Sequence, residues 1–161
     1  MRMSEGVEWA MHSCLNLAWL DSDEAMTAAR LAAFYDLPPA YLNKQLQALA
    51  RAGILTSTPG PRGGFRLARP LERITLLDVV TAIEGPGDAF RCEQVLRNGP
   101  EGRDDVDYRK SCFISQAMRQ AELAWRRELA GQTLADIKAK VERASPGTPK
   151  ATREWFARRR S

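Results

Sequence analysis

The sequence has 161 residues, of which 44% are hydrophobic and 27% are charged. That composition favours one folded, globular unit and excludes a disordered or fibrous chain. No apolar run approaches the roughly 18 residues of a membrane span, and Glu5, Glu8 and His12 interrupt the first apolar stretch, which argues against a signal peptide. We therefore expect a cytoplasmic protein with no membrane partner.

The net charge of +4 is unevenly distributed along the chain. Residues 143–161 hold six basic residues and one acidic residue, whereas residues 1–142 sum to −1. Within that body, residues 30–73 hold seven basic and two acidic residues, and both flanks are acidic. A basic block inside an acidic body indicates either a surface for a polyanion or a solvated basic face.

The spacing of apolar residues predicts three helices in the first part of the chain. The first helix begins after Ser4 and carries apolar residues three or four positions apart. The second helix covers residues 28–35 and has Thr27 as its N-cap. After a short break, the third helix begins at Pro39, which suits a first helical turn, and ends at Gly53.

The pattern then changes to the alternation that is typical of β-strands. Residues 54–57 and 65–68 predict two strands, which the turn-rich residues 59–64 connect. Thr75 begins a capping-box-like sequence that predicts a helix ending at Gly85. Helix, short turn, helix and glycine-tipped hairpin together predict a winged helix-turn-helix, a mainly α fold with a small β-hairpin.

The second half of the chain has a different organisation. Residues 86–111 lack periodicity, which predicts a long loop between Cys92 and Cys112. A long helix is expected from Phe113, followed by a short helix over 134–141. The apolar stripe of the long helix consists of Ile114, Ala117, Met118, Ala121, Ala124, Trp125 and Leu129. The predicted units are a winged helix-turn-helix domain (1–85), a loop with two cysteines (86–112), a pair of helices (113–142) and a basic flexible tail (143–161) in which Trp155-Phe156 forms a docking point.

The third helix of such a fold enters the DNA major groove, and its polar face offers donors to bases and phosphates. The hairpin tip brings arginine charge, and its glycines let the backbone approach phosphates. The residues predicted to contact DNA are Pro39, Tyr41, Asn43, Lys44, Gln47, Arg62, Gly63, Gly64 and Arg66. The alternative is an interaction module of the same shape that does not bind DNA.

Three motifs resemble those of the Rrf-two family of bacterial winged-helix regulators, of the IscR, NsrR and RsrR type. They are Arg51-Ala52-Gly53-Ile54-Leu55, Gly60-Pro61-Arg62-Gly63-Gly64-Phe65 and Ile74-Thr75-Leu76-Leu77-Asp78-Val79. The resemblance covers about residues 4–142. It implies a DNA-binding domain over residues 1–85, a cluster-binding loop over 86–112 and the dimerisation helices of a homodimer over 113–142. The apolar stripe of the long helix would also suit an intramolecular core.

Cluster-binding members of that family carry three closely spaced cysteines in this loop, and the sequence departs from that pattern. A [2Fe–2S] cluster needs four ligands, and nitrogen can replace sulfur. Glu8 and His12 lie four residues apart, which places both side chains on one helix face. The resemblance implies a site between two chains, with Glu8 and His12 from one and Cys92 and Cys112 from the other. Cys14 is expected to be a buried structural cysteine.

Alternatives remain open for these four residues. Glu8 and His12 also suit a solvated pair, Cys92 and Cys112 suit a metal-free dithiol–disulfide switch, and all four suit zinc. Trp9, beside Glu8, is the predicted switch residue, because a change of cluster charge would alter its packing and shift the first helix against the DNA-binding module.

We predict a homodimeric transcriptional repressor that binds a near-palindromic double-stranded DNA operator and senses redox state through a [2Fe–2S] cluster. A cluster-free regulator that responds to thiol oxidation or a small effector is the second hypothesis. An enzyme is disfavoured because the only histidine has no nucleophile motif around it, and the sequence contains no phosphate loop or dinucleotide fingerprint.

Overall fold

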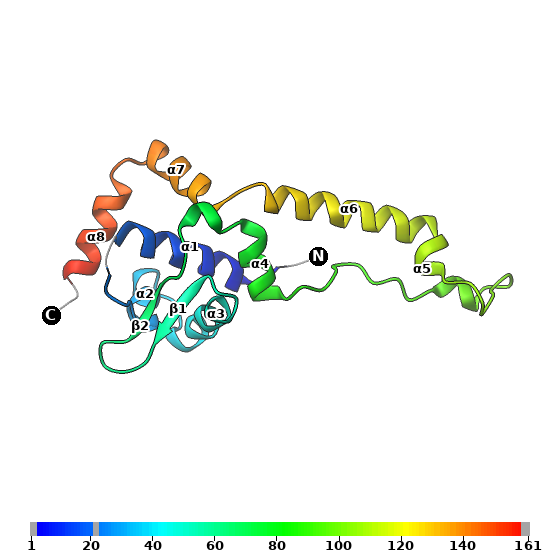
Figure 1. Ribbon diagram of the computed structural model, residues 1–161, viewed down its shortest axis with the longest axis horizontal. Helices are drawn as coiled ribbons and strands as arrows, with labels where there is room; N and C mark the ends of the chain where they lie inside the picture. Colours follow the sequence, from blue (N-terminus) through cyan, green and yellow to red (C-terminus); the bar gives the residue numbers. More distant parts are fainter. Residues whose placement is uncertain (1–2, 21–22, 159–161) are drawn as a thin grey trace.

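The computed structural model describes residues 3–20 and 23–158 (Figure 1). In these residues the fold is mainly helical with one antiparallel hairpin, which confirms the predicted fold class. The elements are α1 (Glu5–Leu20), α2 (Ala28–Phe34), α3 (Pro39–Arg51), β1 (Leu55–Thr58), β2 (Gly64–Leu67), the short 3₁₀ helix η1 (Leu71–Arg73), α4 (Leu76–Glu84), η2 (Val95–Asn98), α5 (Tyr108–Ser111), α6 (Phe113–Ala130), α7 (Leu134–Ala144) and α8 (Thr148–Arg158). None of the described helices is long and apolar enough to cross a membrane.

Local signals in the sequence explain the boundaries of the helix-turn-helix. The Thr27 hydroxyl accepts a hydrogen bond from the Arg30 N–H at 3.3 Å and caps α2, as predicted. Thr75 and Asp78 form a reciprocal capping box at the start of α4. Leu42, Leu46 and Leu49 of α3 are 0% exposed, because their spacing places them on the face that meets the core.

The hairpin is held to the helical body as well as to itself. β1 pairs with β2 in antiparallel register, with Leu55 opposite Leu67. Met26, just before α2, exchanges two backbone hydrogen bonds with Phe65 of β2, at 2.9 and 2.8 Å. Each strand is shifted by one residue from its predicted limits, because the Ile54 N–H still bonds to the last turn of α3 and Gly64 is already paired with β1.

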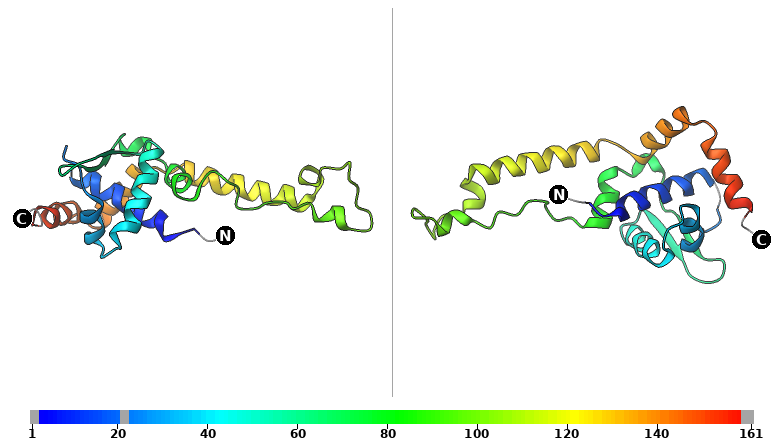
Figure 2. Two further views of the ribbon diagram at one scale, coloured as in Figure 1. Left: turned by 90° about the horizontal axis from the view of Figure 1, so that it is seen from below. Right: turned by 180° about the vertical axis from the view of Figure 1, so that it is seen from behind.

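The segment 86–112 and α6 together form an extended arm, which projects from the helix-turn-helix body (Figures 1 and 2). The long loop was predicted, but it also contains η2 and α5. Arg126 of α6 donates to the Gly87 carbonyl at 3.0 Å, and its ion pair with Glu122 holds the guanidinium in place. These contacts fix the direction in which the loop leaves α4.

The prediction of a loose tail over residues 143–161 is wrong for most of its length. α7 continues to Ala144, and residues 148–158 form α8, which packs against α1 and contacts α2. Phe156 is only 2% exposed, and its ring stacks on Phe34 with centroids 5.3 Å apart. This burial of aromatic surface orders the segment despite its charge. Residues 159–161, the end of the predicted tail, lie outside the described residues.

Candidate functional site

The outer face of α3 presents the residues that were predicted to contact DNA. Tyr41 is 40% exposed, and Asn43 and Lys44 are exposed beside it while Gln47 is half-buried. Pro39 occupies the first turn, as expected. The buried leucines lie on the opposite face, so the 3.6-residue period alone separates the core side of this helix from its polar side.

The hairpin presents charge in the expected way, but its two glycines have a different role from the one predicted. Arg62 and Arg66 are exposed. Gly63 is buried and its N–H already donates to the Gly60 carbonyl at 2.9 Å, so its backbone is not open to a phosphate. Gly64 has φ +136°, and a Cβ there would lie 2.5 Å from the Met26 carbonyl group. The glycines close the turn and let β2 approach Met26.

Glu8 and His12 are both exposed and line one groove, which confirms that they share a face of α1. The groove has a volume of about 440 Å³ and is otherwise mainly apolar. Its other lining residues come from α1, α4, α6 and α7 together with Met3 and Ser4: Met3, Ser4, Val7, Met11, Leu15, Leu76, Val80, Leu129 and Ile137. Two polar side chains in an apolar groove can bind a metal ion or cluster, and such a groove can also pack against a second protein surface.

His12 has a neighbour that the sequence did not indicate. The Tyr35 hydroxyl lies 3.5 Å from His12 Nδ1, and the two ring centroids are 5.4 Å apart. The same hydroxyl lies 3.5 Å from the Oδ1 atom of Asn16, which is 1% exposed. Burial raises the pKa of Tyr35, so its hydroxyl stays protonated at neutral pH. No sequence signal could reveal this contact, because it joins two different helices.

Trp9 connects the face of Glu8 and His12 to the predicted DNA surface. Its ring meets that of Tyr41 edge to face, with centroids 5.1 Å apart. Trp9 belongs to α1 and Tyr41 to the outer face of α3. The predicted switch residue therefore contacts a predicted DNA-binding residue directly.

The three cysteine thiols are free and lie in two different environments. Cys14 is 0% exposed, and burial raises the pKa of its thiol to about 12, in keeping with the predicted structural role. Cys92 and Cys112 are half-buried in the arm, where Cys112 precedes the first residue of α6. Across residues 3–20 and 23–158, no group of three His, Cys, Asp or Glu side chains could hold a metal ion. One chain thus does not bring the four predicted ligands together.

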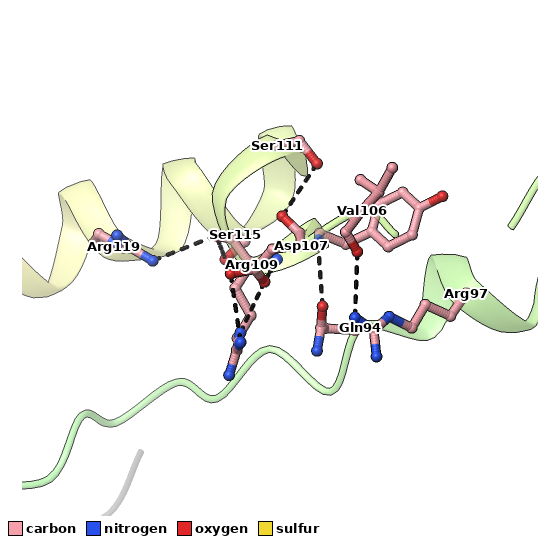
Figure 3. A network of polar contacts seen from close by, with 9 residues as sticks. Gln94, Arg97, Val106, Asp107, Arg109, Ser111, Ser115 and Arg119 are labelled. Atoms are coloured by element: carbon pink, nitrogen blue, oxygen red, sulfur yellow. Dashed lines mark hydrogen bonds and ion pairs between the residues drawn. The ribbon is translucent and has the colours of Figure 1, made fainter. Parts of the chain in front are cut away.

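Polar contacts order the part of the arm that carries the cysteines (Figure 3). The Tyr108 N–H donates to Gln94 Oε1 at 3.2 Å, and the Ser115 hydroxyl donates to the Arg109 carbonyl at 2.9 Å. Arg109 pairs with Asp107 at 2.9 Å and holds the pKa of that carboxyl below its usual value. Arg109 also lines a cavity of about 310 Å³ together with Cys92.

Comparisons with known proteins agree with this architecture. A sequence model of the Rrf2 (Rrf-two) family, described as an iron-dependent transcriptional regulator, matches residues 3–140. YffB of Lactococcus lactis, named as an HTH-type transcriptional regulator, is 35% identical over 139 residues, which are 85% of this chain and 86% of YffB.

Solved structures of 19–20% identity share the fold. The IscR structure from T. potens matches with a TM-score of 0.62 over 90% of this chain and 91% of that one. CymR, the global cysteine regulator of B. subtilis, matches with a TM-score of 0.60 over 87% of this chain and 98% of that one. The family and these relatives are regulators, which confirms that the chain is not an enzyme. The chain belongs to the Rrf2 family of winged-helix transcriptional regulators, which bind DNA and are typically dimeric.

Proposed function

We propose that the protein is a homodimeric repressor that senses redox state through a [2Fe–2S] cluster shared between two protomers. Glu8 and His12 of one protomer and Cys92 and Cys112 of the partner subunit are the proposed ligands. The observation that carries this proposal is the separation of the two ligand pairs. One pair lies on the body and the other on an arm that projects away from it (Figure 1).

The chemistry of the donors fits such a cluster. Two thiols can supply thiolates, and the exposed Glu8 and His12 side chains are open to a second chain. The Tyr35 hydroxyl faces His12 Nδ1, which leaves Nε2 as the ligand nitrogen. The cluster, when bound, supplies a one-electron change of charge.

The contact between Trp9 and Tyr41 supports a short route from the sensor to DNA. Trp9 follows Glu8 directly in α1, so a movement of Glu8 relative to the cluster would also move the Trp9 ring. That ring is in contact with Tyr41 on the face of α3 that we expect to read the operator. A regulator needs two states with different DNA affinity. We propose that the position of Trp9 against Tyr41 distinguishes them.

The DNA-binding mode follows from the fold of each protomer and the symmetry of the dimer. Two copies of α3 related by a dyad fit two half-sites about one helical turn apart, so the operator is expected to be near-palindromic. Tyr41, Asn43, Lys44 and Gln47 are the proposed base and phosphate contacts, with Arg62 and Arg66 on the flanking phosphates. Repression results when the bound dimer covers a promoter.

Anaerobic purification, a visible absorption spectrum and analysis of iron, sulfide and zinc test the sensor. We expect a coloured protein with two iron and two sulfide per cluster, and loss of colour in Glu8→Ala, His12→Ala, Cys92→Ala and Cys112→Ala. Glu5→Ala, at the start of α1, and Cys14→Ala, in the core, are matched controls that should keep the colour.

Other results would overturn the proposal in a specific way. A colourless protein with stoichiometric zinc would identify a structural metal, and a metal-free protein with a reversible Cys92–Cys112 disulfide would identify a dithiol switch. A cluster that survives in both Glu8→Ala and His12→Ala would refute these ligands. Equal DNA affinity of the oxidised, reduced and cluster-free protein would refute the redox switch.

A further inference from the structure

α8 is a basic helix that lies beyond the part of the chain matched by the family. The family match ends at residue 140, and α8 covers Thr148–Arg158. The helix holds Lys150, Arg153 and Arg158 against a single acid, Glu154, and two further arginines follow it in the sequence. A loose tail with basic residues would attract nucleic acid only without direction, but the helix gives Lys150, Arg153 and Arg158 defined positions.

Aromatic contacts and hydrogen bonds fix α8 to α1 and α2. The Phe156 ring stacks on Phe34 of α2, and Trp155 meets the same ring edge to face at 4.9 Å. Arg30 of α2 donates to the Phe156 carbonyl at 2.6 Å. Arg153 donates to the Trp19 carbonyl, near the end of α1, at 3.2 Å. The orientation of α8 is therefore tied to α1 and α2.

The outer face of α8 carries two matched cations at its opposite ends. Lys150 and Arg158 each lie four residues from Glu154, at 3.8 and 3.5 Å from its carboxylate. Their side chains are 79% and 78% exposed. Exposed ion pairs of this kind are weak, so the pairing with Glu154 does not keep either side chain from approaching a phosphate.

The two cations differ in their position relative to the DNA-binding face. α8 lies at the end of the molecule opposite to the arm, and it runs from α7 towards the level of α2 and the hairpin (Figures 1 and 2). Arg158 is at the end of α8 nearer to that level, whereas Lys150 is at the end nearer to α7. The first helix of a DNA-reading pair crosses the sugar-phosphate backbone, and α8 packs on that helix.

We propose that the C-terminal end of α8, through Arg158, binds backbone phosphates of DNA outside the operator half-site. This inference rests on the proposed operator binding and extends it, because it assigns a phosphate contact to a helix that lies beyond α3 and the hairpin. The contact reads no base, so it lengthens the site that the dimer protects without changing the sequence it selects.

The test uses an operator selected by the full-length protein from random duplexes, prepared once with ten extra base pairs at each end and once trimmed. Affinity is measured by fluorescence anisotropy over a series of KCl concentrations for wild type, Arg158→Gln and Lys150→Gln. Each lost phosphate contact reduces the slope of log K against log salt by about 0.9, so the two copies in a dimer give about 1.8. We expect that reduction for Arg158→Gln on the long duplex only, and wild-type slopes for Lys150→Gln.

Equal slopes for wild type and Arg158→Gln on the long duplex would overturn the inference, and so would the same reduction on both duplexes or in both variants. Such results would mean that the charge acts at long range rather than through a contact. The proposed function fails separately, when no operator is selected or when Asn43→Ala leaves selective binding intact.

Discussion

Single residues show how local backbone geometry determines the position of the hairpin formed by β1 and β2. Gly64 and Gly60 both have positive φ, at +136° and +97°. Only Gly64 is also crowded, because a Cβ there would meet the Met26 backbone at 2.5 Å, whereas nothing lies within 4 Å of a Cβ at Gly60. Positive φ thus allows a tight turn at Gly60 and a close approach of two backbone segments at Gly64.

The matched substitutions Gly64→Ala and Gly60→Ala test this difference. We expect Gly64→Ala to lower the free energy of unfolding by at least about 2 kcal/mol, and Gly60→Ala by about 1 kcal/mol, because only the first combines backbone strain with a clash. Urea denaturation followed by circular dichroism measures both. Equal losses in the free energy of unfolding would show that the close approach of β2 to Met26 does not contribute to stability.

The contact between Trp9 and Tyr41 gives a second prediction at this scale. Edge-to-face aromatic pairs contribute about 0.5–1.5 kcal/mol beyond their buried area, and about 1.4 kcal/mol is a tenfold change in affinity. We therefore expect Trp9→Leu to reduce the ratio of operator affinities of the oxidised and reduced protein by up to about tenfold. Tyr41→Leu should act in the same way and add nothing to Trp9→Leu. An unchanged ratio in Trp9→Leu would contradict this route.

Secondary-structure elements divide into those that their own sequence specifies and those that depend on distant contacts. The starts of α2 and α4 were predictable, because Thr27 and Thr75 are caps that act within three residues. The exposed face of α3 followed from its periodicity. Trp155-Phe156 was expected to dock, but the helix α8 and its partner were not predicted, because Phe156 is buried against Phe34 of a remote helix. For the same reason, the sequence indicated Glu8 and His12 but not the contact between His12 and Tyr35.

Phe156→Ala tests whether this tertiary contact holds α8 in place. Removing a buried phenylalanine typically costs about 3–5 kcal/mol, and Phe156 is 2% exposed. We expect a loss of this size in the free energy of unfolding, together with faster amide exchange over residues 148–158. Lys150→Ala, on the exposed side of α8, should change stability by less than about 0.5 kcal/mol. Unaltered exchange in Phe156→Ala would show that other contacts suffice to hold α8.

At the scale of the whole molecule, the arm exposes an apolar surface that a single protomer does not cover. Phe113 is 84% exposed, Ile114 is 69% exposed and Met118 is 41% exposed. The predicted stripe of α6 therefore faces outward over most of its length instead of filling an intramolecular core. Contiguous exposed apolar surface of this kind marks an interaction site, and a second copy of the arm offers the matching surface around a dyad. The same dyad would bring Cys92 and Cys112 to the partner's α1.

Ile114→Glu tests the dimer and the shared sensor together. A charge that becomes buried in an apolar interface loses its hydration, so we expect this variant to be monomeric in analytical ultracentrifugation while it keeps its helical circular dichroism. Because one chain does not assemble the four ligands, the monomer should also be colourless after anaerobic purification. Leu123→Glu introduces the same charge at another exposed aliphatic residue, nine positions further along α6 and on the face opposite to Ile114, and should remain dimeric and coloured. A monomeric Ile114→Glu protein that retains iron and sulfide would place the cluster within a single chain and would refute the shared site.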